Sequence, residues 1–268
     1  MASRLVDQVV LITGASSGIG AATARACARA GMHVLLHGRR EDRLAQVVEE
    51  VRAAGRSAES VVGDVTERGL ASRLLDAAQH RFGRFDVVFA NAGYGFKKPA
   101  HLVSDADLRH IFDVNFFAAC ELLTEAARRL LAEQRPGHLL MCSSAVAKFT
   151  MINFSAYSAT KAAQNHVCRA MRMELRPHGI EVSSVHPITT RTEFFERSAE
   201  RSGRPVDPAR VFDHVPRWLL QRPEQVADAV VRCLRRPKPE VWTSLAARVA
   251  AGVVTVFPRL MDVLGRRG

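Results

Sequence analysis

Short apolar runs alternate along the chain with longer stretches whose apolar residues recur at helical spacing. The apolar runs predict strands at residues 8–13, 33–37, 58–62, 86–90, 138–143, 180–185 and 240–243. The longer stretches predict helices at about 19–30, 41–54, 67–82, within 105–134, 156–176 and 223–235. Such alternation favours a parallel sheet covered by helices on both faces. Because crossovers are right-handed, the pattern predicts a doubly wound α/β fold with a seven-stranded parallel sheet.

The alternation stops after Val185. Residues 188–217 are rich in Thr, Arg, Pro and Phe, and we expect a long irregular loop there, of the kind that forms a lid or binding loop. The end of the chain carries an apolar stripe at Leu245, Val249, Val253, Val256 and Leu260. No change of composition marks a second domain. We therefore expect one domain over residues 1–243, including the loop 188–217, followed by an amphipathic tail over residues 244–268.

The net charge of +11 raises the question of an anionic partner. The Arg residues are scattered, however, in blocks no longer than two. Such scatter favours solvated helix faces over a nucleic-acid surface, so we expect no nucleic-acid partner. Part of the charge is available to an anionic cofactor or substrate.

The five cysteines and the terminal segments indicate what metal sites and which cellular compartment to expect. They form no Cys-x-x-Cys pair and have no neighbouring His spacing, so we expect no metal site. An odd, dispersed set suits a reducing cytoplasm. Residues 1–10 contain no apolar run, so no signal peptide is expected, and the apolar run 249–257 is too short to span a bilayer.

A glycine-rich segment joins the first expected strand to the first expected helix. It reads Thr13-Gly14-Ala15-Ser16-Ser17-Gly18-Ile19-Gly20. Glycines there permit positive φ and let a pyrophosphate approach the backbone, while the helix N-terminus supplies free N–H groups. The spacing differs from the usual dinucleotide fingerprint, and a plain glycine-rich turn is the alternative to a cofactor loop.

Tyr157 and Lys161 stand four positions apart within an expected helix, so their side chains share one face. A cation beside a phenol lowers the ordinary phenol pKa of about 10 toward the range of a general acid or base. An incidental pair on an amphipathic surface helix is the alternative.

Together these motifs resemble the single-domain, NADP-preferring branch of the short-chain dehydrogenase/reductase family, which has a Rossmann fold. The resemblance extends from the first strand to about residue 240. Asn91-Ala92-Gly93 ends the fourth strand, where the family supports its adenosine pocket, and Asp64 with Val65 ends the third, where that Asp meets the adenine. The resemblance implies an oxidoreductase that interconverts a carbonyl and an alcohol.

The resemblance also implies four catalytic residues. Tyr157 would be the general acid/base, and Lys161 would lower its pKa and hold the nicotinamide ribose. Ser144, thirteen residues before Tyr157, would donate a hydrogen bond to the substrate oxygen. Asn115 matches the family's helix Asn, which connects that Lys to solvent through water.

The choice of cofactor follows from Gly38-Arg39-Arg40, after the second strand. NAD-selective members carry an acidic residue there for the ribose 2′-hydroxyl. Arg39 stands where NADP-preferring members place an Arg, whose guanidinium can fork onto a 2′-phosphate, although two solvated Arg residues are the alternative. The resemblance implies NADP(H), bound by Gly14, Ser16, Ser17, Gly18, Ile19, Gly20, Arg39, Arg40, Asp64, Val65, Asn91, Ala92, Gly93, Tyr157, Lys161, Pro187, Thr190 and Thr192.

The chain departs from the family pattern near the substrate. Ala145-Val146-Ala147 replaces the family's x-Ala-Gly, Ile152 replaces a Pro, and Ile188 replaces a Gly. Thr190 stands where the family has Val or Ile. These changes affect loop geometry and substrate shape rather than the four catalytic residues.

Several aromatic and apolar residues fall in segments that form the family's substrate pocket: Phe96, Phe149, Met151, Phe154, Phe194, Phe195, Phe212 and Trp218. An apolar pocket suits a lipophilic ketone or alcohol, although many of these side chains could equally be core. A 3-oxoacyl-thioester reductase and a non-catalytic NADP-binding sensor are the alternatives. The helices within 105–134 and 156–176 are those through which family members pair, so we expect a homodimer or homotetramer. The tail would pack on the domain, on an oligomer partner or on a membrane surface.

Overall fold

The main sheet of the protein has seven parallel strands. The computed structural model describes residues 5–202, 212, 215–216, 219–260 and 262. The strands follow the order β3-β2-β1-β4-β5-β6-β9. Their bounds are β1 Val9–Thr13, β2 His33–Gly38, β3 Ala58–Val62, β4 Val87–Ala90, β5 Gly137–Cys142, β6 Ile180–His186 and β9 Glu240–Trp242. The predicted doubly wound α/β fold is confirmed.

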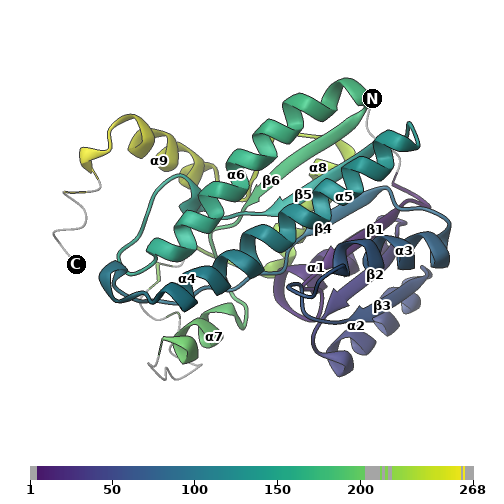
Figure 1. Cartoon of the computed structure of the whole chain (residues 1–268), viewed down its shortest axis with the longest axis horizontal. Coiled ribbons are helices and arrows are strands. Elements are labelled where there is room, and N and C mark those ends of the chain that lie inside the picture. The colour runs from purple at the N-terminus through teal and green to yellow at the C-terminus, as the bar shows by residue number, and fades with distance from the viewer. Residues whose placement is uncertain (1–4, 203–211, 213–214, 217–218, 261, 263–268) are drawn as a thin grey trace.

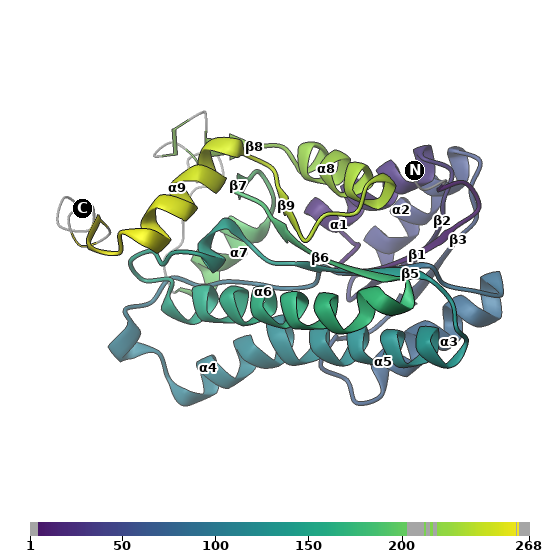
Figure 2. The same ribbon diagram turned by 90° about the horizontal axis from the view of Figure 1, so that it is seen from above.

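Helices cover both faces of this sheet, as Figures 1 and 2 show. One layer contains α1 (Gly18–Arg29), α2 (Glu41–Ala53) and α8 (Pro223–Arg235), and the other contains α3 (Leu70–Phe82), α5 (Ala118–Ala132) and α6 (Ser155–Leu175). Because both faces are covered, the central strands are continuous apolar runs, and all five residues of β1 are buried. The strand order reverses between β1 and β4, which opens a crevice at the carboxyl ends of the strands.

The expected long helix within 105–134 is two helices. α4 (Asp105–Phe112) and α5 are joined by a π-helical turn over Asp113–Phe117. The expectation of continuity was wrong because a single wide turn leaves the apolar periodicity almost unchanged. Asn115 lies in this turn and is fully buried. Its side chain accepts a hydrogen bond from the Tyr94 N–H at 2.9 Å and donates one to the Tyr94 carbonyl at 2.9 Å, which ties the turn to the end of β4.

The segment expected to be an irregular loop contains ordered elements. β7 (Thr189–Thr190) pairs in parallel with β8 (Leu220–Gln221), and α7 is a helix over Phe194–Arg201. The expectation of an irregular loop was therefore wrong for these residues. Phe194 packs on Tyr157, with ring centroids 5.4 Å apart, so tertiary contact stabilises a short helix that the surrounding sequence does not suggest. Short 3₁₀ turns cover Ala100–Leu102, Ala145–Ala147 and Arg176–His178.

The tail begins with a helix, α9 (Leu245–Val256), which extends away from the sheet in Figure 2. Ala247 and Ala251 are buried, whereas the apolar stripe expected from the sequence faces outward: Leu245 is 73% exposed and Val256 is 69% exposed. No described helix is both long and apolar enough to cross a membrane. The division into a domain over 1–243 and a tail stays a prediction.

Candidate active site

The glycine-rich turn between β1 and α1 forms the floor of the crevice. Gly14 and Gly18 adopt positive φ angles of 65° and 54°. At Gly20 an added Cβ would lie 2.3 Å from the Gly14 carbonyl oxygen, so only glycine lets the first turn of α1 pack this closely. Ser17 makes no side-chain cap at the N-terminus of α1, and the first turn has no acidic residue. The exposed N–H groups and the partial positive charge suit an anionic ligand.

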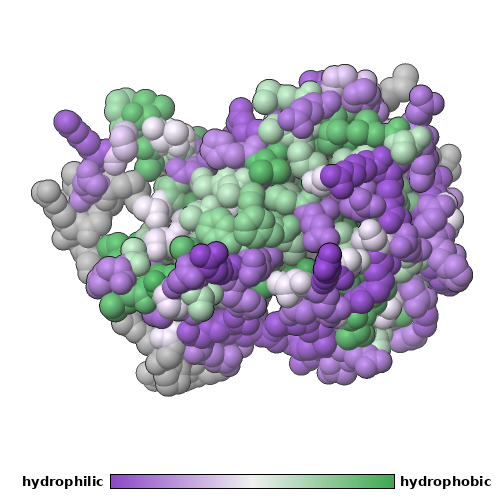
Figure 3. Space-filling view, viewed as in Figure 1, coloured by the Kyte–Doolittle hydropathy of each residue, from purple (hydrophilic) through white to green (hydrophobic). Residues whose placement is uncertain are grey.

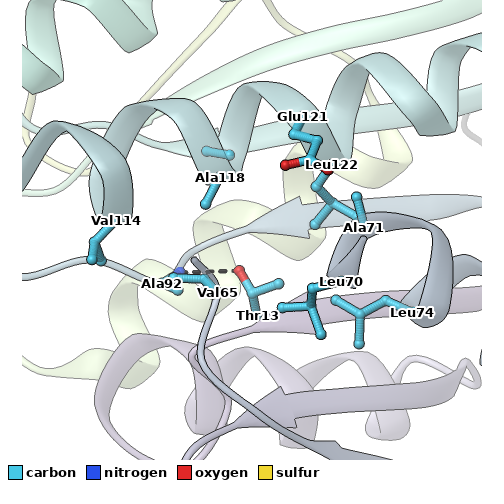
Figure 4. A pocket seen from close by; sticks show the side chains of 11 residues that line it. Thr13, Val65, Leu70, Ala71, Leu74, Ala92, Val114, Ala118, Glu121 and Leu122 are labelled. Atoms are coloured by element: carbon cyan, nitrogen blue, oxygen red, sulfur yellow. Dashed lines mark hydrogen bonds between the residues drawn. The ribbon is translucent and has the colours of Figure 1, made fainter. Parts of the chain in front are cut away.

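Hydrogen bonds to Thr13 hold the loop after β4 beside this turn, and Figure 4 shows the one from Ala92. Its hydroxyl oxygen accepts hydrogen bonds from the Asn91 N–H at 3.0 Å and the Ala92 N–H at 3.1 Å. The Asn91 amide donates to the main-chain oxygens of Thr13 and Gly14, at 3.0 and 3.3 Å. The Asn91-Ala92-Gly93 segment therefore holds a fixed position beside the glycine-rich turn, because both are bound to the end of β1.

Two arginines stand at the end of β2, in different environments. The Arg40 guanidinium donates to the Ser17 hydroxyl at 2.7 Å and pairs with Glu193 at 2.9 Å. The Arg39 side chain is 58% exposed and only reaches Asp64 at 3.5 Å. Burial raises the pKa of Asp64, but hydrogen bonds from Thr66 outweigh it, so the pKa lies below its ordinary value.

Three side chains converge at the ends of β5 and α6. Tyr157 and Lys161 lie on one face of α6, with the Lys161 Nζ 5.5 Å from the Tyr157 ring centroid. Ser144 follows β5, and its hydroxyl accepts a hydrogen bond from the Val146 N–H at 3.3 Å. Burial raises the pKa of the Tyr157 phenol, and a hydrogen bond with Ser144 opposes this rise. Burial lowers the pKa of Lys161 to about 8, so its ammonium gives up a proton more readily than that of an exposed lysine.

The expected lowering of the Tyr157 pKa by Lys161 is therefore not seen in this structure. Burial of the phenol dominates, because removing a phenolate from water is costly. Tyr157 accordingly holds its proton at neutral pH. A protonated phenol is the form that a general acid needs.

A second buried amide completes this group. Gln164 lies one turn beyond Lys161 on α6 and is fully buried. Its Oε1 accepts a hydrogen bond from the Lys161 Nζ at 3.1 Å, and its Nε2 donates to the main-chain oxygen of Asn115 at 2.5 Å. The sequence gives only a weak sign of this role, because Gln is an ordinary helix residue and its partner on the π turn lies 49 positions earlier. A polar residue on the buried face of an amphipathic helix, three positions after a lysine, is the only available signal.

One cavity of about 1150 Å³ joins these parts. Almost all residues expected to bind a cofactor line it: Gly14, Ser16, Ser17, Gly18, Ile19, Arg39, Arg40, Asp64, Val65, Asn91, Ala92, Gly93, Tyr157, Lys161, Pro187, Thr190 and Thr192. Ser144 lines it as well. Gly20 and Asn115 do not, because Gly20 supports the turn from below and Asn115 lies behind Lys161. His37 lines the cavity without having been expected, and neither of its ring nitrogens has a hydrogen-bond partner within the described part of the chain.

The comparisons with known proteins agree with this geometry. A model of the short chain dehydrogenase family matches residues 8–203. The chain belongs to the short-chain dehydrogenase family. It is 37% identical over 190 residues to an A-factor type gamma-butyrolactone 1'-reductase (1S-forming) of Streptomyces virginiae, covering 70% of this chain and 74% of that protein. It is 31% identical over 263 residues to the uncharacterized oxidoreductase YxnA of Bacillus subtilis, covering 97% of this chain and 72% of that protein.

A solved structure shows the same fold. A short chain dehydrogenase/reductase from Burkholderia phymatum in complex with NAD superposes with a TM-score of 0.85 at 24% identity, covering 97% of this chain and 96% of that one. At 24% identity this similarity is evidence for the fold only. Family membership makes the chain an oxidoreductase that acts between a carbonyl and an alcohol.

The apolar wall of this dehydrogenase matches only part of the expected set. Phe149, Met151, Phe154, Phe194 and Phe195 line the cavity. Phe96 instead belongs to a small buried cluster with Ile111 and Ala156, so its assignment to the pocket was wrong. Phe212 packs edge-on against Phe195, with centroids 5.4 Å apart, and is not part of the cavity wall. Trp218 lies outside the described residues.

The segment 187–192 after β6, called the strap below, is held by hydrogen bonds from both sides. The Pro187 carbonyl accepts a hydrogen bond from the Ala145 N–H at 3.0 Å, which ties the strap to the loop that carries Ser144. The Thr190 hydroxyl donates to the Ile188 carbonyl at 2.8 Å and accepts from the Gln221 amide at 2.9 Å. The Thr190 hydroxyl is thus engaged within the strap, and the Thr190 carbonyl accepts a hydrogen bond from the Thr192 hydroxyl at 3.4 Å.

Proposed function

We propose that this dehydrogenase transfers hydride between NADP(H) and a lipophilic carbonyl or alcohol, with Tyr157 as general acid/base. The proposal is supported by the cavity of about 1150 Å³, whose lining includes Tyr157, Lys161 and Ser144 together with the glycine-rich turn and an apolar wall. A cofactor and a substrate would therefore meet at these three side chains. No metal is required by this chemistry.

The cavity fits a dinucleotide. The turn at Gly18 leaves so little room that an added Cβ would lie 3.0 Å from Thr192, and the glycines keep the backbone open to a pyrophosphate. The ring nitrogens of His37, which have no hydrogen-bond partner among the described residues, lie beside Gly63 and Asp64, where the adenosine would bind. Arg39 and Arg40 stand at the β2 end, and Gly38 occupies the place of an acidic residue, which together support a 2′-phosphate. When bound, a reduced nicotinamide supplies the hydride.

Tyr157 would deliver the proton that balances this hydride. Its O–H would donate to the carbonyl oxygen while Ser144 donates a second hydrogen bond to the same oxygen, so the oxygen becomes a hydroxyl as the carbon is reduced. The phenolate left behind lies near the Lys161 ammonium, which stabilises it. Lys161 also has an N–H available for the nicotinamide ribose. In the oxidative direction Tyr157 takes the proton back.

The apolar wall supports a bulky lipophilic substrate, because Phe149, Phe154 and Phe194 leave few polar contacts for a small hydrophilic one. α9 contributes Ala246, Ala250 and Val254 to the same cavity. A 3-oxoacyl thioester is the second candidate substrate, favoured by the cations Lys97 and Arg201 on the cavity wall, which would attract its anionic carrier. A non-catalytic NADP-binding sensor is the third possibility.

Exposed apolar side chains support assembly. Phe117 is 56% exposed and Met173 is 75% exposed, on the side formed by α5 and α6, where Figure 3 shows a green band. A homodimer or homotetramer through these helices would cover them. The outward stripe of α9 is available to an oligomer partner or to a membrane surface. All five cysteines are free thiols, which supports the expected cytoplasmic setting.

Steady-state turnover tests this proposal. Oxidation of NADPH, and separately of NADH, is followed by absorbance with aliphatic, aromatic, steroid and 3-oxoacyl-thioester carbonyls. Faster turnover with NADPH on a lipophilic ketone, lost in Tyr157→Phe, is the expected result. Tight NADPH binding without turnover on any carbonyl or alcohol favours the sensor, and preference for NADH contradicts the role given to Arg39.

A further inference from the structure

The buried Gln164 amide joins the Lys161 ammonium directly to the backbone of the π turn. Lys161 and Gln164 are 4% and 0% exposed. Because they stand three positions apart on α6, their side chains lie on the same helix face as Tyr157. The N–H₂ group of the same amide donates a hydrogen bond to the main-chain oxygen of Asn115.

The orientation of this amide follows from the chemistry of its two partners. An ammonium can only donate hydrogen bonds and a carbonyl oxygen can only accept them. Gln164 must therefore turn its oxygen to Lys161 and its N–H₂ to Asn115. The reverse orientation would place donor against donor and acceptor against acceptor in a buried site, which is costly.

Within the described residues, the hydrogen bonds of Lys161 leave it one free N–H. Of its three N–H groups, one donates to the Cys142 carbonyl at 2.7 Å and one to Gln164 at 3.1 Å. Lys161 also lines the cavity beside Gly93, where an added Cβ would lie 3.5 Å from its Nζ. The remaining N–H is accordingly the one that can reach a ligand in the cavity.

We propose that Gln164 is a positioning residue. Its amide links the Lys161 ammonium to the Asn115 carbonyl and so holds the ammonium in one position, with a single N–H directed at the cavity. A side-chain amide links Lys161 to the Asn115 carbonyl in this chain, at the place where the family resemblance implies a water. The remaining Lys161 N–H would then reach the nicotinamide ribose of a bound cofactor, beside the Tyr157 phenol. This consequence rests on the proposed function, whereas the hold on the ammonium does not.

Few other groups act on the charge of Lys161. Tyr157 faces it from one turn earlier on α6, and the Cys142 thiol faces it from β5. The Asn115 side chain, on the π turn, carries no charge and donates a hydrogen bond to the Thr160 hydroxyl at 3.1 Å. Within the described part of the chain no carboxylate forms an ion pair with Lys161, so Gln164 is the one side-chain acceptor available to it.

Direct titration of Lys161 tests the proposal without substrate or cofactor. The chain has only five lysines, at 97, 98, 148, 161 and 238, so ¹³Cε-labelled lysine gives a simple NMR spectrum. The Lys161 resonance is assigned as the one missing from Lys161→Met. Loss of a hydrogen bond to a charged group changes an equilibrium about ten- to a hundred-fold. In Gln164→Leu we therefore expect the Lys161 midpoint to fall by about one to two pH units.

Asn165→Leu is the matched control. It removes a buried amide from the next position of α6, where the Asn165 oxygen accepts a hydrogen bond from the Ser184 hydroxyl at 3.0 Å instead of one from Lys161. Its Lys161 midpoint is expected to stay at the parent value. An unmoved midpoint in Gln164→Leu, or an equal movement in Asn165→Leu, overturns the proposal.

A second variant covers the case in which Gln164→Leu does not fold. Gln164→Glu keeps the side-chain length and places a carboxylate beside the ammonium, so the midpoint should rise instead of falling; an unmoved midpoint again overturns the proposal. If the midpoints move as expected while no carbonyl is turned over, Gln164 keeps its role and the proposed function fails. If a substrate is found, the alkaline limb of kcat/KM should move with the Lys161 midpoint.

Discussion

Replacing Arg39 by Ala should separate the binding of NADPH from that of NADH. The Arg39 side chain is 58% exposed, and its only ionic partner within the described residues, Asp64, lies at the long distance of 3.5 Å. The guanidinium is therefore free to turn toward a 2′-phosphate. Arg40 is less free, because it already donates to Ser17 at 2.7 Å and pairs with Glu193 at 2.9 Å.

The size of the effect follows from the bonds exchanged. A hydrogen bond to a charged phosphate is worth about 1.5–3 kcal/mol. Giving up an exposed ion pair with Asp64 costs about 0–1 kcal/mol. The net loss in Arg39→Ala is then about 0.5–3 kcal/mol, or roughly 2- to 150-fold in the Kd of NADPH. The Kd of NADH should change little, because NADH has no 2′-phosphate.

Fluorescence titration of both cofactors measures these Kd values. Arg43→Ala is the control, since Arg43 is an exposed α2 residue that does not line the cavity and its loss removes the same net charge. The preference for NADPH should also weaken with added salt. Equal weakening of NADPH and NADH in Arg39→Ala, or the same loss in Arg43→Ala, would refute the direct contact with the 2′-phosphate.

Two further predictions concern the turn and the sheet edge. Gly20→Ala should weaken NADPH binding at least about tenfold, because the added Cβ would lie 2.3 Å from the Gly14 oxygen and displace the turn. Isothermal titration calorimetry measures this affinity, and an affinity equal to that of the parent contradicts the prediction. Burial would raise the pKa of Glu240, but hydrogen bonds from Lys148 and Trp242 outweigh it and hold the pKa at about 2. Its stabilisation is then complete above the ordinary value of 4.5 and is lost as the pH falls toward 2. Urea unfolding should show that Glu240→Gln loses about 1–3 kcal/mol at pH 7 and that its deficit shrinks below pH about 4.5; a deficit independent of pH counts against the ion pair.

The sheet was predictable from the sequence because its strands are buried on both faces. Continuous apolar runs such as Val9–Thr13 are then the direct mark of a strand, and the helices between them keep a regular apolar face. The motifs around Gly14 and Tyr157 could be placed for the same reason, since they follow the ends of those strands.

The features that the sequence did not predict have physical causes of two kinds. The π turn at Asp113–Phe117 adds too little to disturb an apolar period, and α7 is stabilised by Phe194 against Tyr157, a contact between distant segments. Gln164 could not be assigned because its function depends on the carbonyl of Asn115, which only the packing of α6 on the π turn brings within 2.5 Å. Local pattern cannot show which polar groups meet in a buried site.

Deuterium transfer from NADPH labelled at the C4 hydride position is the most direct test of the central claim. With the best carbonyl of the panel, mass spectrometry of the product should show one deuterium on the new carbinol carbon for each NADPH oxidised. Tyr157→Phe should bind NADPH as the parent does but slow the transfer by about 10²–10⁴-fold, because the proton donor is gone. Product without deuterium, or transfer at the parent rate in Tyr157→Phe, would contradict hydride transfer with Tyr157 as the acid.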